Sequence, residues 1–187
     1  MAGYNPSGDI ATELRRKTVA TAVIGALESQ SGLDTLPAQV SMARILTGVF
    51  KKTGVKFKPL GHGRMRWTFD FVTPGEDLGI VLKLGSKQAT ARDIALTLAF
   101  PEDRAQIFAV TEYGVVAERV GPCTRVFVTD AEFDVFIAER FQGRYIGVGL
   151  GDLGQIGDRI VMIGSSTRVI KKDAAVKGSA SQQIRTA

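Results

Sequence analysis

The sequence predicts an α+β fold: an N-terminal helical hairpin, then a mostly antiparallel sheet with one or two packed helices. Two observations predict this class. Apolar residues recur with a helical period up to residue 54, and from residue 55 onward they fall in short alternating or continuous runs typical of strands. The chain has 187 residues, of which 44% are hydrophobic and 23% charged, and this is enough for one ordinary domain with a core.

Residues 8–31 are predicted to form the first helix. Gly32 is typical of the residue after a helix end, and one face carries apolar residues at positions i, i+3, i+4, i+7 and i+8, namely Val19, Ala22, Val23, Ala26 and Leu27. Arg15, Arg16 and Lys17 lie in the first half, where the helix dipole does not favour cations. We therefore expect these three to face solvent or a partner.

A second helix is predicted over residues 37–53. Pro37 suits a first helical position, and Gly54 suits a helix end. The apolar face repeats the same spacing with Met42, Ile45, Leu46, Val49 and Phe50. We treat residues 1–54 as one helical unit, whose apolar stripe covers either the following sheet or another subunit.

Residues 55–170 are predicted to form the α+β unit. The expected strands are 55–58, 66–72, 79–84, 107–110, 115–120 and 159–163. Helices are expected over 89–100 and 130–141, the latter capped by Thr129 or Asp130. The segment 145–157 is glycine-rich, and no helix or strand is predicted for it. Residues 171–187 are small and polar, so we expect a flexible basic tail.

The net charge of +5 is concentrated near the two ends of the sequence. Residues 1–60 carry eight Lys/Arg against four Asp/Glu, and residues 161–187 carry five against one. The ends include Arg15, Arg16, Lys17, Lys171 and Lys172, which we take as a candidate surface for contact with another subunit or with nucleic acid. A solvated basic surface with no partner is the alternative.

Composition excludes several classes of site. One cysteine and one histidine rule out an intramolecular disulfide and a zinc site of the usual kind, so no metal site is expected. No apolar run is long enough to span a bilayer, and a membrane partner is not expected. The polar N-terminus lacks the apolar core of a signal peptide, so we expect a protein that is not secreted through one.

Two features suggest phosphate chemistry. Gly61 and Gly63 lie between strands, where a backbone without Cβ atoms can approach a phosphate closely. Lys83 is a lone cation in an apolar strand, and a buried lysine needs an anionic partner, for which Asp93 is the first candidate and Glu102 the second. Each feature has a plainer interpretation, namely a glycine hairpin turn and a lysine that faces solvent from an edge strand.

The order of these elements resembles the N-lobe of protein kinases: a glycine-containing hairpin, a Val-Leu-Lys-Leu strand, a helix, two strands and a hinge-like segment at residues 120–122. The chain is similar to short protein-kinase-like proteins encoded by tailed bacteriophages, and the resemblance covers residues 60–167. It implies a nucleotide site for Mg-ATP formed by Gly61, Gly63, Lys83, Asp93 and Asp152, with Asp152 in the place of the catalytic aspartate.

Departures from the kinase pattern argue against catalysis. Arg66 stands where the third glycine of the phosphate loop is expected, and no asparagine follows Asp152 at the family's spacing. Gly164 stands where the metal-binding aspartate is expected, so Mg²⁺ would lack a protein ligand. The sequence also stops before a helical lobe that would bind an acceptor.

We therefore expect no catalytic residues and no cofactor. The predicted function is that of a non-catalytic structural or adaptor protein, such as an accessory protein of a phage capsid, neck or tail, located in the virion or the cytoplasm. Its partners would be other subunits of the assembly, with nucleic acid as a further possibility through the basic ends. The alternative is a kinase-like protein that binds Mg-ATP with reduced or no phosphotransferase activity.

Overall fold

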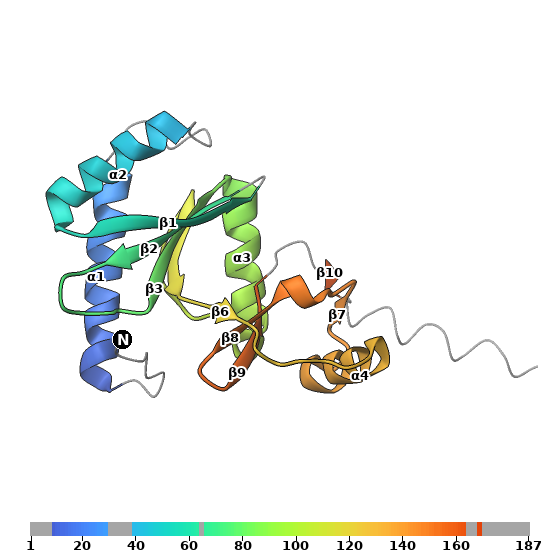
Figure 1. The fold of residues 1–187 in the computed structure, drawn as a ribbon. Helices are drawn as coiled ribbons and strands as arrows, with labels where there is room; N and C mark the ends of the chain where they lie inside the picture. The colour runs from blue at the N-terminus through green and yellow to red at the C-terminus, as the bar shows by residue number, and fades with distance from the viewer. Residues whose placement is uncertain (1–8, 30–38, 64–65, 164–167, 170–187) are drawn as a thin grey trace, which may run out of the picture.

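The computed structural model describes residues 9–29, 39–63, 66–163 and 168–169, and it has the predicted α+β architecture (Figure 1). The helices in those ranges are α1 (Ile10–Glu28), α2 (Gln39–Thr53), α3 (Lys87–Ala99) and α4 (Asp130–Phe141), with short 3₁₀ turns η1 (Pro101–Asp103) and η2 (Leu150–Asp152). The main sheet is antiparallel and consists of β1 (Lys56–Gly63), β2 (Arg66–Val72), β3 (Ile80–Gly85), β4 (Ile107–Thr111) and β5 (Gly114–Glu118).

Two smaller sheets follow the main sheet. The small sheet has three antiparallel strands, β6 (Gly121–Pro122), β8 (Leu153–Ile156) and β9 (Arg159–Met162). A separate pair joins β7 (Tyr145–Ile146) to β10 (Arg168–Val169). The glycine-rich segment that received no element in the sequence therefore contains β7, η2 and β8.

Local sequence signals explain where the first two helices begin and end. The side chain of Asp9 accepts a hydrogen bond from the Ala11 N–H at 3.2 Å, which satisfies a donor that has no partner within the helix. Gly54 follows α2 with φ of +71°, and its N–H donates to the Phe50 carbonyl at 2.8 Å. The start predicted for the second helix, at Pro37, lies outside the described residues.

The main sheet has the strand order β1-β2-β3-β5-β4, and its two faces differ in character. Alternation along β3 directs Ile80, Leu82 and Leu84 to one face and Lys83 to the other. Helix α1 covers the apolar face, and α3 lies against the face that carries Lys83 (Figure 1).

The helical hairpin and the main sheet share one hydrophobic core. Val23 and Leu27 of α1, Val49 of α2, and Phe69 and Leu82 of the sheet are all buried in the same cluster. The hairpin therefore covers its own sheet, which is one of the two positions that the sequence left open. The described parts of residues 1–54, namely 9–29 and 39–54, share their buried apolar residues with the core of the sheet.

A second core lies between α4 and the small sheet. Phe141, Tyr145, Leu153 and Met162 are buried there. The α4 N-terminus is capped as predicted, because the Thr129 hydroxyl accepts from the Glu132 N–H at 3.1 Å.

Ion pairs join this second core to the main sheet. The Asp103 side chain is completely buried and accepts two parallel hydrogen bonds from Arg144, at 3.0 Å from Nε and 2.9 Å from Nη2. Arg159 of β9 reaches Glu118 of β5 at 3.0 Å. These contacts fix the small sheet and α4 against the end of the main sheet (Figure 1).

Candidate functional site

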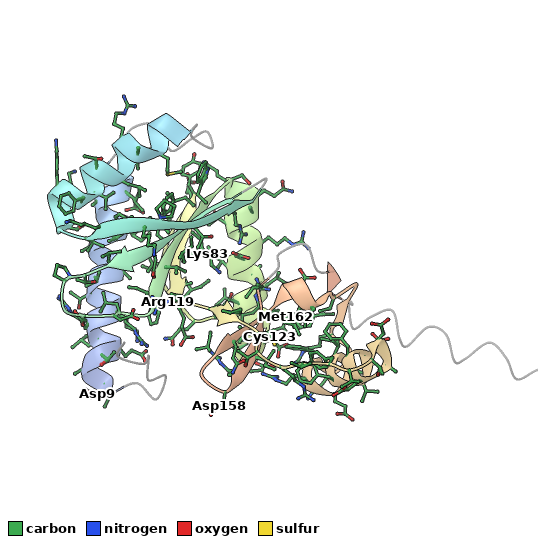
Figure 2. The ribbon with its side chains drawn as sticks, viewed as in Figure 1. Asp9, Lys83, Arg119, Cys123, Asp158 and Met162 are labelled. Carbon is green, nitrogen blue, oxygen red and sulfur yellow. The ribbon has the colours of Figure 1, made fainter. Side chains whose placement is uncertain are left out.

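Lys83 lies between the main sheet and α3 (Figure 2). Its strand, β3, has β2 on one side and β5 on the other, and Lys83 is opposite Thr68 and Val115. The alternative in which Lys83 faces solvent from an edge strand is therefore wrong. The strand fixes the position of the Lys83 side chain beneath α3.

Asp93 is the carboxylate that the sequence predicted as the partner of Lys83, but it forms its ion pairs with two arginines. It is buried on α3, with 6% of its side chain exposed, and it forms ion pairs with Arg66 of β2 and with Arg104, which follows η1. Arg104 Nη2 donates to Asp93 Oδ1 at 3.1 Å, and Arg66 Nη2 also donates to the Ala89 carbonyl at 2.6 Å. Asp93 thus links α3 to β2 and to the segment after η1.

Lys83 forms no ion pair with any carboxylate in the part of the chain that the structure describes. Burial lowers the pKa of Lys83 from its usual value; Asp93 acts in the opposite direction, and Arg66 and Arg104 add to the lowering. Three basic side chains therefore surround one carboxylate. We call Lys83, Asp93, Arg66 and Arg104 the cationic cluster.

The cavity beside the cationic cluster is small. Lys83, Asp93, Arg104 and Met162 are among its lining residues, and its volume is about 10 Å³. That volume holds about one water molecule, whereas small-molecule sites usually enclose about 300–1,000 Å³. In this arrangement the cluster has no room for a nucleotide.

The two glycines of the predicted phosphate loop lie in β1. Gly61 is opposite Thr68, just after an irregularity in the register at Pro59, and Gly63 is opposite Arg66. A Cβ atom added at Gly61 would meet no atom within 4 Å, so no close approach of another group requires a glycine there. Residues 64–65, at the tip of this hairpin, lie outside the described residues.

Asp152 is not part of the cationic cluster. It ends η2, and its Oδ2 accepts a hydrogen bond from the Gly149 N–H at 3.0 Å. Its carbonyl accepts from the Ile163 N–H at 2.8 Å, and Ile163 lines the small cavity while Asp152 does not. The structure therefore brings Lys83 and Asp93 together and leaves Asp152 outside; Gly164 lies beyond the described residues.

The predicted basic surface is only partly formed on α1. Arg16 is buried at 5% exposure, and its Nε donates to the Leu78 carbonyl at 2.8 Å, so the prediction that it faces solvent or a partner is wrong. Its guanidinium anchors α1 to the segment before β3. Arg15 and Lys17 are exposed and pair with Glu76 and Glu13, at 3.4 Å and 3.0 Å. Lys171 and Lys172 lie outside the described residues.

An apolar groove that the sequence reasoning missed lies between α2 and the β1–β2 hairpin. Its volume is about 620 Å³, and we call it the α2 groove. Its lining residues are Met42, Ala43, Leu46, Thr47 and Phe50 of α2 and Lys56, Phe57, Pro59, Trp67 and Phe69 of the two strands. The signal available in the sequence was the absence of acidic residues from position 39 to position 63.

A second groove lies beside α4 and was also missed. It encloses about 740 Å³, and we call it the α4 groove. Its lining residues are Phe127, Val128, Thr129, Asp130, Phe133, Asp134, Val148, Gly149 and Leu150. Two of these are acidic and none is basic, so its charge is opposite to that of the α2 groove.

No protein-family model matches this sequence, and a search of curated proteins finds no match to it. In the described part of the chain, no three His, Cys, Asp or Glu side chains are grouped so that they could hold a metal ion. Among the described helices, none has the length and apolar character needed to cross a membrane.

Proposed function

We propose that this chain is a non-catalytic structural or adaptor protein that works by binding other protein subunits. The observation that carries the proposal is the state of the cationic cluster. The Asp93 carboxylate, which would pair with Lys83 in a kinase-like site, is bonded to Arg66 and Arg104 instead. With a cavity of about 10 Å³ beside it, the cluster serves to join α3 to the sheet.

Exposed apolar surface supports a binding role. Val126, Val128 and Leu98 are each at least 78% exposed; the lining of the α2 groove is mostly apolar, and that of the α4 groove combines apolar side chains with Thr129, Asp130 and Asp134. Apolar patches of this kind mark sites of contact with other proteins. An accessory component of a phage virion is the specific form of this proposal that the resemblance to phage proteins suggests.

Binding of Mg-ATP is the second candidate function, and one observation favours it. Three basic side chains surround a single carboxylate, so the cationic cluster attracts polyanions. For a triphosphate to enter, α3 would have to move away from the sheet and Asp93 would have to release at least one arginine.

Thermal unfolding with and without Mg-ATP separates the two functions. A ligand that binds only the folded state raises the melting temperature, by an amount that grows with ligand concentration. We expect no rise for the wild-type protein. A concentration-dependent rise that disappears in Lys83→Ala would overturn the proposal in favour of nucleotide binding.

A further inference from the structure

The α2 groove is bordered by basic side chains that have no acidic partner. Residues 39–63 contain Arg44, Lys51, Lys52, Lys56 and Lys58 and no acidic residue. Lys56 lines the groove, while Arg44 and Lys51 are exposed next to the lining residues Ala43 and Phe50. Among the described residues, none of these three forms an ion pair.

The lining of the α2 groove is itself suited to apolar contact. Phe50 is 39% exposed, and the Lys56 ammonium lies over its ring at 5.8 Å from the centroid. Trp67 and Phe69 stack with ring centroids 6.2 Å apart. An apolar floor within a charged rim is the usual organisation of a protein interface.

The surface around α4 has the opposite charge and also exposes apolar side chains. Residues 126–139 contain four acidic residues, namely Asp130, Glu132, Asp134 and Glu139, and the Arg125 cation lies over two aromatic rings of this segment, at 5.1 Å from the Phe127 centroid and 4.3 Å from that of Phe136. Asp130, Asp134 and Glu139 are exposed and form no ion pair in the described part of the chain. In the same segment Val126, Val128 and Val135 are 80%, 86% and 55% exposed.

The two surfaces lie at opposite ends of the molecule. Figure 1 shows α2 and β1 at one end and α4 at the other, with the main sheet and α3 between them. One copy of the chain therefore cannot place its own α4 in its own α2 groove. A contact between the two surfaces must join different copies.

We propose that copies of this chain associate head to tail, with the acidic, valine-bearing α4 surface of one copy docked on the basic α2 groove of the next. This inference rests on the proposed assembly function and names a second copy of the chain as the partner. Each contact leaves one α2 groove and one α4 surface unused, at the two ends of the pair. The association is therefore heterologous and continues into a ring or an open filament.

Complementary charge-reversal variants test the geometry of this contact. In the groove variant, Arg44→Glu and Lys56→Glu make the rim of the α2 groove acidic. In the α4 variant, Asp130→Lys and Asp134→Lys reverse the charge of the two acidic residues that line the α4 groove. Like charges then face one another in each homotypic contact, and we expect the dissociation constant to rise by at least about tenfold.

Size-exclusion chromatography with light scattering provides the readout. The wild type should form oligomers whose mass rises with protein concentration and falls with added salt. Each variant alone should be a monomer. A mixture of the two should assemble again, because every contact between unlike variants pairs opposite charges: the intact α4 surface meets the intact groove, and the reversed α4 surface meets the reversed groove.

The mixture also serves as the folding control, since each variant must be folded to assemble with the other. Asp158→Lys, in the exposed turn between β8 and β9, is a matched charge reversal outside both surfaces and should assemble like the wild type. Trp67 is the only tryptophan, so its fluorescence should change when the groove is occupied in the mixed assembly.

Three results would overturn the inference: a wild type that is monomeric at every concentration, an α4 variant that still dimerises alone through groove-to-groove contact, or variants that do not combine on mixing. None of these results depends on nucleotide binding. If the wild type is monomeric and Mg-ATP does not stabilise it, self-association is refuted and a different protein subunit remains as the partner. If Mg-ATP does stabilise it, the proposed function itself is refuted.

Discussion

Replacement of Asp93 by Asn tests whether this carboxylate holds the α3 layer on the sheet. Asp93 has 6% of its side chain exposed and pairs with Arg104 at 5% and Arg66 at 17% exposure. Asparagine keeps the shape and removes the charge, so Arg66 and Arg104 would lose the carboxylate that pairs with both of them. Removal of one partner from a buried ion pair costs about 3–5 kcal/mol.

That loss is large compared with the total stability of a domain, which is about 5–15 kcal/mol. For a chain of this length, each kcal/mol lowers the melting temperature by about 2–4 °C, so we expect a drop of about 6–20 °C. Urea unfolding should show a lower midpoint with an unchanged slope, because the surface exposed on unfolding stays the same. Asp158→Asn, in the exposed turn between β8 and β9 and outside both proposed contact surfaces, is the matched control and should change stability by less than about 0.5 kcal/mol.

A loss below about 1 kcal/mol for Asp93→Asn would refute the reasoning, since it would mean that the arginines do not depend on this carboxylate. A double-mutant cycle makes the test specific. In an Arg104→Met background one of the two arginines that pair with Asp93 is already absent. The loss of unfolding free energy caused by Asp93→Asn should then be smaller by about 1 kcal/mol or more. Additive losses would contradict the pairing between Asp93 and Arg104.

Three further substitutions have defined outcomes. Burial lowers the pKa of Lys83, so the folded protein releases this proton at a lower pH than the unfolded chain does. The free energy of unfolding therefore rises with pH between the folded and the unfolded pKa of Lys83. Lys83→Met should abolish that rise and should stabilise the protein at neutral pH by about 1 kcal/mol, measured by urea unfolding. A less stable Lys83→Met protein would contradict this. Thr129→Ala removes the α4 cap and should cost about 1 kcal/mol, and an unchanged urea midpoint would argue against the capping bond. Gly154→Ala places a Cβ 2.2 Å from a Val120 methyl group and should cost about 1–3 kcal/mol, whereas Gly151→Ala, which meets nothing within 4 Å, should cost far less; equal thermal shifts would refute the crowding argument.

The sequence predicted the elements well because their signals are local. The α4 bounds and its Thr129 cap agree with the structure, since the cap and the apolar period lie within a single segment. The β2 strand at residues 66–72 also agrees, because it alternates without interruption. The strand β8 was missed, because Gly154 is needed for a close approach to Val120, and that approach depends on the distant strand β6.

The side-chain environments were harder to predict than the elements. Arg16 was placed at the surface with Arg15 and Lys17 because the helix dipole does not favour cations in the first half of a helix. Helical rotation instead turns Arg16 inward, where its Nε donates to the Leu78 carbonyl. The partners of Asp93 were missed for a related reason. Arg66 lies 27 residues before Asp93, on β2, whereas Asp93 lies on α3; the two meet because β2 places Arg66 opposite Gly85, just before α3 begins.

The central claim is that the sheet serves as a scaffold in which Asp93 is held by Arg66 and Arg104 and no nucleotide binds at Lys83. Phosphorus NMR of Mg-ATP titrated with the protein tests this claim most directly, because it observes the phosphates themselves. The account predicts α-, β- and γ-phosphate resonances that keep their positions and widths at protein excess. Saturable broadening or shifts that Lys83→Ala abolishes would contradict it.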